Sequence, residues 1–321
     1  MISVRNLHKS FGPKVAVNGV SFTVEKGEVL GFLGPNGAGK STTMRMITGF
    51  IPPTSGQISV GGFDMLENPI MAKRLIGYLP ENAPLYADMD VAGFLGFAAE
   101  LRGLGGDARR RAIDRVVELC FLRPVLHQSI DTLSKGYRHR TCFAQAIIHD
   151  PAVLILDEPT DGLDPNQKRE VRGLIRSMGE KKAIIFSTHI LEEVEAACSR
   201  AIIIDRGRIV ANGTPEELKL RSQNAGAVTL RLLAGDTAAV KQTIDQLPEV
   251  GRSTVIADTP PALRIFGTKP ARDGELARIV GELAARKQWR IQELHTEEGR
   301  LDDVFRTITQ SETAVPQEEA T

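Results

Sequence analysis

The chain has 321 residues, enough for about two domains with hydrophobic cores of their own. Its 40 basic residues balance its 40 acidic ones, so no overall charge directs it to nucleic acid or to an anionic membrane surface. Cys120, Cys142 and Cys198 form no C-x-x-C pair, which favours buried thiols in a reducing cytoplasm. We expect neither a signal peptide nor a membrane-spanning helix, so a partner has to supply any transmembrane part.

Alternating strand and helix patterns up to about residue 220 predict an α/β sheet domain. Its opening strands form an antiparallel edge or a small sheet, and a nearly continuous helical pattern at about 88–150 predicts an inserted helical subdomain. The expected opening strands are Ile2–Leu7, Ala16–Val17 and Val20–Val24, the buried strands Val29–Leu33, Ile76–Leu79, Val153–Leu156, Ala183–Phe186 and Ala201–Ile204, and the helices Ser41–Thr48, Pro165–Met178 and Leu191–Ala197.

A glycine-rich segment follows the first buried strand and precedes a helix. It reads Gly34-Pro35-Asn36-Gly37-Ala38-Gly39-Lys40-Ser41-Thr42 and fits the pattern G-x-x-x-x-G-K-[ST] in the required context. Glycines let the backbone N–H groups wrap around an anion, and the helix adds its positive N-terminal end. Lys40 is expected to reach the outer phosphates, and the Ser41 hydroxyl to bind Mg²⁺. The segment predicts a nucleoside triphosphate site.

Acidic residues end a later buried strand, where an α/β sheet presents its ligands. Asp157 is expected to hold Mg²⁺ together with Ser41, and Glu158 to activate the attacking water. The alternative is a solvated acidic turn before Pro159. His189 follows another strand and can donate a hydrogen bond to the outer phosphate in the transition state, although a histidine in that position is often structural.

The segment Leu133-Ser134-Lys135-Gly136-Tyr137 opens the helix that continues to about His149. Ser134 is a good N-cap residue, which is its simplest role. A capped helix N-terminus beside Gly136 can also bind an anion.

These motifs, with Gly162-Leu163-Asp164, resemble an ABC ATPase over residues 1 to about 220. The resemblance implies that Ser134, Lys135 and Gly136 form a signature that binds ATP held by the opposite subunit of a head-to-tail homodimer or heterodimer. It also implies that Phe11 stacks on adenine and that Asp164 contacts the facing subunit. Phe11 as an ordinary core aromatic, and Asp164 as a helix N-cap before Pro165, are the simpler alternatives.

Two positions depart from the family pattern. Glu81 stands where the family usually has a glutamine that touches Mg²⁺; its carboxylate can still bind the metal but adds negative charge near the triphosphate. Lys135 stands at the second glycine position of the signature. Since lysine tolerates positive φ poorly, either the position does not demand it or strain is stored there.

A second domain is expected after a polar, flexible linker at 222–226, so that the ATPase domain spans 1–221. Residues 227–310 predict a β-α-β-β-α-β order, hence a ferredoxin-like α+β domain, with an amphipathic last helix and a disordered tail at 311–321. Its strands are expected at Val228–Leu232, Thr254–Ala257, Ala262–Phe266 and Trp289–Leu294, and its helices at Thr237–Leu247 and Glu275–Ala285, the second capped by Asp273.

The resemblance extends to the branch of ABC ATPases that serves type-two exporters, including gliding-motility-associated ones, because of Tyr78-Leu79-Pro80-Glu81-Asn82 and the C-terminal unit. It implies an ATP- and Mg²⁺-dependent ATPase at the cytoplasmic face of a separate membrane permease, with a docking surface near Glu81, Asn82 and Leu85–Met89. A nucleotide-gated assembly module with little turnover, or a soluble non-transport ABC ATPase, are the alternatives. The neutral charge balance speaks against nucleic-acid binding.

Overall fold

The computed structural model describes residues 1–81, 84–268 and 274–310. The chain divides into two compact units, Met1–Pro215 and Glu216–Thr321. The domain end expected at residue 221 falls slightly after this division. Asn82, Asp273 and the expected tail at 311–321 lie outside the described residues.

The first unit opens with an antiparallel sheet of strand order β2-β1-β4-β5. The two short strands expected at Ala16–Val17 and Val20–Val24 are wrong, because the chain forms one long strand that pairs with β1 from Val24 back to Lys14. β4 was not predicted, because glycine, glutamine and serine weaken its strand pattern. The strands are β1 (Ile2–Phe11), β2 (Lys14–Val24), β4 (Ser55–Val60) and β5 (Phe63–Asp64).

A larger sheet, of order β10-β9-β3-β8-β7-β6, forms the centre of this unit. Its strands are parallel except for the edge strand β10. Every residue of β3 and β7 is buried, as expected for parallel strands covered on both faces. The strands are β3 (Val29–Leu33), β6 (Ile76–Leu79), β7 (Val153–Asp157), β8 (Ala183–Thr188), β9 (Arg200–Asp205) and β10 (Arg208–Gly213), of which β10 was not predicted.

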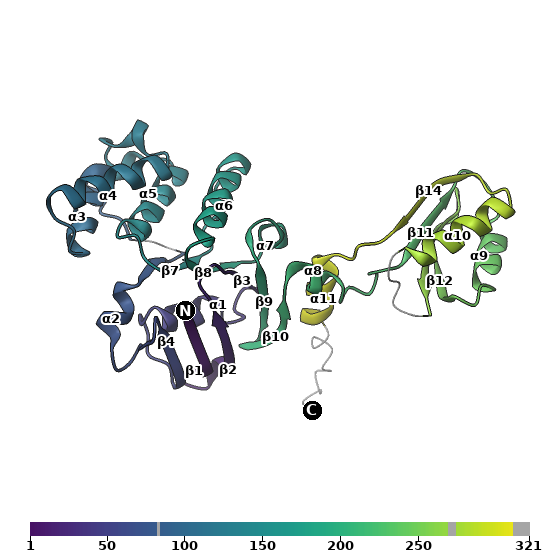
Figure 1. Ribbon diagram of the computed structural model, residues 1–321, viewed down its shortest axis with the longest axis horizontal. Helices are drawn as coiled ribbons and strands as arrows, with labels where there is room; N and C mark the ends of the chain where they lie inside the picture. The colour runs from purple at the N-terminus through teal and green to yellow at the C-terminus, as the bar shows by residue number, and fades with distance from the viewer. Residues whose placement is uncertain (82–83, 269–273, 311–321) are drawn as a thin grey trace, which may run out of the picture. The chain divides into compact units, whose positions relative to one another are not determined.

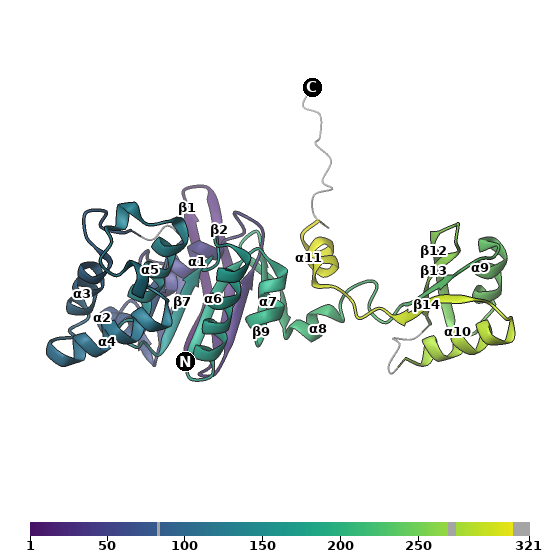
Figure 2. The same ribbon diagram turned by 90° about the horizontal axis from the view of Figure 1, so that it is seen from above.

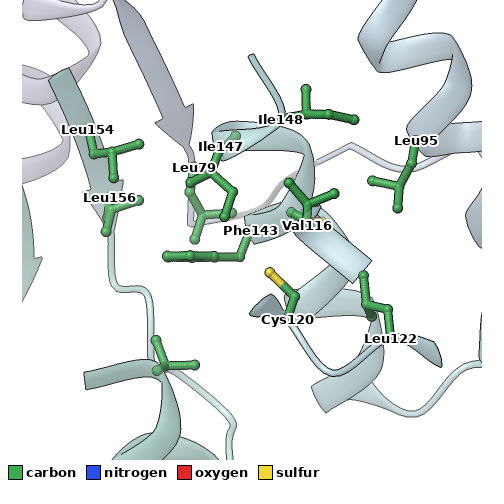
Figure 3. Packing of buried hydrophobic residues seen from close by; sticks show 14 of the residues in the cluster. Leu79, Leu95, Val116, Cys120, Leu122, Phe143, Ile147, Ile148, Leu154 and Leu156 are labelled. Carbon is green, nitrogen blue, oxygen red and sulfur yellow. The ribbon is translucent and has the colours of Figure 1, made fainter. Parts of the chain in front are cut away.

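The helical subdomain expected at about 88–150 is present and consists of α3, α4 and α5, which lie together beside the sheet strands in both views (Figures 1 and 2). Its core is continuous with that of the sheet: Phe143 of α5 lies between Leu156 of β7 and Val116 of α4 (Figure 3). The helices of the unit are α1 (Lys40–Ile47), α2 (Pro69–Arg74), α3 (Val91–Leu101), α4 (Gly106–Leu119), α5 (Lys135–Ile147), α6 (Pro165–Gly179) and α7 (Leu191–Ala197), with 3₁₀ turns at Arg123–Val125 and Ile130–Thr132.

The second unit contains an antiparallel sheet of order β12-β13-β11-β14. With the chain order β-α-β-β-α-β, this is a ferredoxin-like arrangement, as expected. α9 and α10 share one core with the sheet, in which Val240 and Val280 join Val228 and Leu230. The elements are α8 (Pro215–Lys219), β11 (Val228–Leu232), α9 (Thr237–Asp245), β12 (Val250–Ala257), β13 (Ala262–Gly267), α10 (Glu275–Arg286), β14 (Ile291–Thr296) and α11 (Leu301–Gln310).

Two details of this unit differ from the expectation. β14 begins at Ile291 rather than Trp289, because Trp289 packs with the hydrophobic core at the end of α10 instead. The N-cap of α10 is Gly274, in a left-handed conformation and without a side-chain cap hydrogen bond, whereas the expected cap, Asp273, lies outside the described residues. Among the described residues, no helix has both the length and the apolar character that a membrane crossing requires.

Candidate active site

The predicted phosphate-loop, metal-binding and catalytic residues gather where four neighbouring strands of the central sheet end. Leu33 of β3 is in register with Thr188 of β8, and Asp157 of β7 with Ser187 of β8. β6 lies beside β7 and ends at Leu79. Since the strands are parallel, their carboxyl ends meet at one edge, and the loops that follow them come together there.

The glycine-rich loop leads from β3 into α1, as predicted. Gly39 has φ 106°, and a Cβ atom there would lie 2.5 Å from the carbonyl oxygen of Ala16, so only glycine fits. Gly37 has φ 82°. No side chain caps the N-terminus of α1, whose first backbone N–H groups are therefore left to bind an anion.

Lys40 is almost fully buried at the start of α1. Its Nζ donates hydrogen bonds to the carbonyl oxygens of Gly34, at 2.7 Å, and Pro35, at 3.2 Å. Burial lowers the pKa of Lys40, while the negative charges of Glu158, Asp157 and Glu81 oppose that shift. The ammonium group is thus held inside its own loop and faces acidic residues from two other strand ends.

Asp157 is the last residue of β7 and is 1% exposed. Its Oδ1 accepts hydrogen bonds from Ser187 Oγ, at 2.5 Å, and from Ser41 Oγ, at 3.2 Å. Its Oδ2 is buried and has no hydrogen-bond partner in the described structure. A buried carboxylate oxygen without a donor, next to a serine hydroxyl, is a donor set that suits a hard cation such as Mg²⁺, which completes its shell with water and phosphate oxygens.

Glu158 follows Asp157 and has φ 51°, a conformation that costs a non-glycine residue of the order of 1 kcal/mol or more. Its backbone N–H donates to Ser187 Oγ at 3.0 Å, which helps to hold this conformation. Its carboxylate lies 3.3 Å from Nδ1 of the half-exposed His189. The solvated acidic turn considered for this segment is wrong, because Asp157 is buried and both acids have specific partners.

A cavity of about 740 Å³ lies at this edge of the sheet. That volume is within the range of sites for small molecules and cofactors. Phe11 is 50% exposed at its rim, so the alternative of a core aromatic is wrong. The cavity is lined by Phe11, Lys14, Ala16, Asn36, Gly37, Gly39, Lys40, Ser41, Thr42, Glu81, Glu158, Asp161 and His189.

The signature residues do not line this cavity. Ser134 caps α5 by accepting a hydrogen bond from the N–H of Tyr137 at 3.3 Å, so its simplest expected role is confirmed. Lys135 is helical and is not among the residues with positive φ, so its position does not demand a glycine conformation. Its Nζ lies 3.2 Å from Asp161 Oδ2 in the loop after β7.

The loop after β7 is tied to the signature helix. Asp164 caps α6 and forms a capping box with Gln167, as its simpler role predicted. A Cβ atom on Gly136 would lie 2.7 Å from the side-chain oxygen of Gln167, so the small residue allows a close approach of α5 to α6. The other predicted loop residues, Gly34, Pro35 and Ala38, form the turn behind the cavity, and Ala38 is buried.

Sequence reasoning missed Ser187 and three residues that line the cavity, one of which is Ala16. Ser187 bonds to both Asp157 and Glu158, and Lys14 and Asp161 line the cavity. The signal for Ser187 was a polar residue at the end of an otherwise apolar strand, next to Thr188 and His189. Lys14 is the first residue of β2, directly after a turn of ordinary appearance, and only the pairing of β2 with β1 brings it to the site.

A phosphate loop at a parallel sheet edge, a buried strand-end aspartate and an inserted helical subdomain define a P-loop NTPase of the ABC type. A family model described as "ABC transporter" matches residues 17–161. A second model, described as "AAA domain, putative AbiEii toxin, Type IV TA system", matches residues 128–195.

Bacterial relatives carry the same assignment. The Nod factor export ATP-binding protein I of Burkholderia lata is 33% identical over 309 residues, which cover 96% of each chain. The probable multidrug ABC transporter ATP-binding protein YbhF of Escherichia coli K12 is 40% identical over 225 residues, 70% of this chain but only 39% of the relative's length. The chain belongs to the ATP-binding proteins of ABC transporters.

Solved structures agree with this assignment. One described as the ATP-binding subunit of an ABC transporter superimposes with a TM-score of 0.64 at 30% identity, covering 68% of this chain and 92% of that one. The ABC ATPase fold expected from the sequence is confirmed.

Proposed function

We propose that the chain binds and hydrolyses MgATP and thereby powers export through a separate membrane permease. The observation that carries this proposal is the convergence of Lys40, Glu158 and His189 at one cavity, where the lining residue Ser41 is hydrogen-bonded to Asp157. Lys40 and the loop N–H groups would hold the phosphates. The Mg²⁺ would be held by Ser41 and Asp157, with Glu81 nearby. When bound, Mg²⁺ would neutralise phosphate charge. Glu158 would take a proton from the attacking water, and His189 would donate a hydrogen bond to the outer phosphate.

A facing subunit would complete the site. The chain has one phosphate loop and one signature, and its own signature residues lie outside its cavity. Ser134, Lys135 and Gly136 would therefore contact the ATP of a second copy or of a close relative, with Asp164 at the contact and Phe11 stacked on adenine. The names of two relatives, for multidrug transport and for Nod factor export, favour the exporter branch.

An apolar groove with a volume of about 620 Å³ is the proposed permease-docking site. It lies between α1, β6 and α3, and the exposed Phe50 and Leu101 stand at its rim. Tyr86 packs edge-on against Phe97 at a centroid distance of 5.5 Å, so aromatic rings shape the groove. A helix with apolar side chains fits such a groove, and binding there would keep the chain peripheral at the cytoplasmic face of the membrane. It is lined by Arg45, Phe50, Tyr78, Pro80, Pro84, Tyr86, Phe94, Phe97, Ala98, Leu101, Arg102 and Gln145.

We expect Leu101→Asp to abolish co-purification with the proposed permease, because a carboxylate would enter an apolar contact. Since Leu101 is 71% exposed in the free chain, ATP affinity and thermal unfolding should remain those of the parent protein. Ile70→Asp is the matched control, because Ile70 is 68% exposed on α2 and does not line the groove. Undiminished transport by the Leu101 variant would reject this docking site.

Glu81 offers a test of the metal assignment. Its side chain lines the cavity, and its negative charge opposes the lowering of the Lys40 pKa by burial. We expect Glu81→Gln to raise the Mg²⁺ concentration needed for half-maximal hydrolysis by about two- to tenfold, because an amide is a weaker ligand than a carboxylate. The midpoint of thermal unfolding should not change. An identical Mg²⁺ titration for both proteins would remove Glu81 from the metal site.

A further inference from the structure

A buried carboxylate lies just outside the cavity, on α7. Glu193 is 1% exposed, and its Oε1 accepts a hydrogen bond from Thr160 Oγ1 while its Oε2 accepts one from Thr188 Oγ1 at 2.7 Å. Lys168 Nζ, from the first turns of α6, is 4.0 Å from Oε1. An ionisable group is rarely so buried without a specific set of partners, because desolvation of its charge is costly.

The partners of Glu193 come from the two segments that carry the proposed reaction groups. Thr160 lies in the loop after β7, two positions beyond Glu158, and is 2% exposed. Thr188 is the last residue of β8 and directly precedes His189. Its Oγ1 also accepts the backbone N–H of Ile190 at 3.0 Å, so this hydroxyl fixes the backbone on both sides of His189.

We infer that Glu193 is a positioning residue that ties the Glu158 loop to the His189 loop, so that the two groups keep one relative geometry during hydrolysis. Ser187 makes a first connection between the strand ends, at the level of Asp157. Glu193 makes a second connection, between Thr188 at the end of β8 and Thr160 in the loop after β7. Glu193 does not line the cavity and therefore acts only through Thr160 and Thr188.

The simpler role for Glu193 is structural. It lies in the first turn of α7, where an acidic side chain stabilises the helix by about 0.3–1 kcal/mol. That role would be shared by the exposed Glu192 beside it and does not need both threonine hydroxyls. It also predicts lower stability without a selective effect on catalysis.

The inference rests on the proposed ATPase function, and its test compares Glu193→Ala, Glu193→Gln and the matched control Glu192→Ala. We expect Glu193→Ala to lower kcat by about tenfold or more, with the Kd for ATP within about threefold, because small misplacements of reacting groups are costly. Glu193→Gln can still bond both hydroxyls and should recover most of kcat. Glu192→Ala should behave as the parent protein.

Hydrogen exchange tests the connection without turnover. In Glu193→Ala, the amides of residues 160–163 and 188–190 should both lose protection, although they belong to different loops. In a double-mutant cycle of Thr160→Val and Thr188→Val, the double variant should lower kcat little more than the worse single variant does, because either change breaks the same connection.

Each outcome has a distinct meaning. Parent-like kcat and exchange in Glu193→Ala, or a parallel loss of stability, ATP binding and kcat that Glu193→Gln does not recover, would overturn the inference. A parent protein that binds ATP but never hydrolyses it would instead overturn the proposed function, and the exchange of the two loops would still decide whether Glu193 connects them.

Discussion

Glu158→Gln is expected to reduce ATP hydrolysis by about a hundredfold or more, the usual contribution of a positioned general base. Glutamine keeps the shape of the side chain and can still contact His189, but it cannot take a proton from water. The backbone of residue 158 should keep its φ of 51°, because its N–H bond to Ser187 Oγ does not involve the side chain. ATP affinity, measured by equilibrium binding, should stay within about threefold of the parent value, since the phosphate loop is intact.

The same variant tests the proposed dimer. If hydrolysis reopens two chains that ATP has closed, blocking hydrolysis should leave a dimer that requires MgATP and dissociates when the nucleotide is removed. Sedimentation with and without MgATP measures this directly. Glu192→Gln, an exposed change on α7, is the matched control. Parent-level turnover in Glu158→Gln would mean that another group activates the water.

The centre of the fold was predictable because its strands are short apolar runs that end in chemically distinctive residues. The phosphate loop, Asp157-Glu158 and His189 each follow such a run, and parallel strands necessarily bring their ends to one edge. β4 and β10 were missed because neither is continuously apolar: each has buried and exposed positions, and both contain glycine and polar residues with weak strand propensity.

The connections between strand ends could not be predicted, because they depend on register. Ser187 reaches Asp157 only because β7 and β8 pair those two residues. The exposure of Phe11 depends on where β1 ends, four residues beyond the predicted Leu7, in the hairpin that β1 forms with β2. Propensity and pattern give the type of an element, whereas tertiary pairing decides which of its side chains meet.

Lys135 illustrates a question that only the backbone could answer. The sequence left open whether lysine at a family glycine position stores strain. The residue is the first of α5 and adopts helical angles, so lysine fits there without strain. Its ammonium group instead pairs with Asp161, with both side chains more than half exposed. An exposed pair of this kind contributes about 0–1 kcal/mol, so its removal should change stability little.

Lys40→Ala is expected to lower ATP affinity by about a hundredfold, in contrast to the preserved binding of Glu158→Gln. Charge-assisted hydrogen bonds contribute about 1.5–3 kcal/mol each, and a lysine in this loop contacts the outer phosphates. Its Nζ donates hydrogen bonds to the carbonyl oxygens of Gly34 and Pro35, so the variant also loses two bonds within the loop. Equilibrium binding of ATP and of ADP measures the effect.

The comparison with ADP separates two roles of Lys40. If its ammonium group acts on the outermost phosphate, the variant should lose more affinity for ATP than for ADP. If the ammonium group only shapes the loop, the affinities for ATP and for ADP should fall equally. Lys26→Ala removes an exposed lysine from the turn before β3 and is the control for charge alone. ATP binding by Lys40→Ala at parent affinity would contradict the site itself, because Lys40 is the buried cation that faces Asp157, Glu158 and Glu81 there. Without that cation, the three carboxylates would repel the triphosphate rather than admit it.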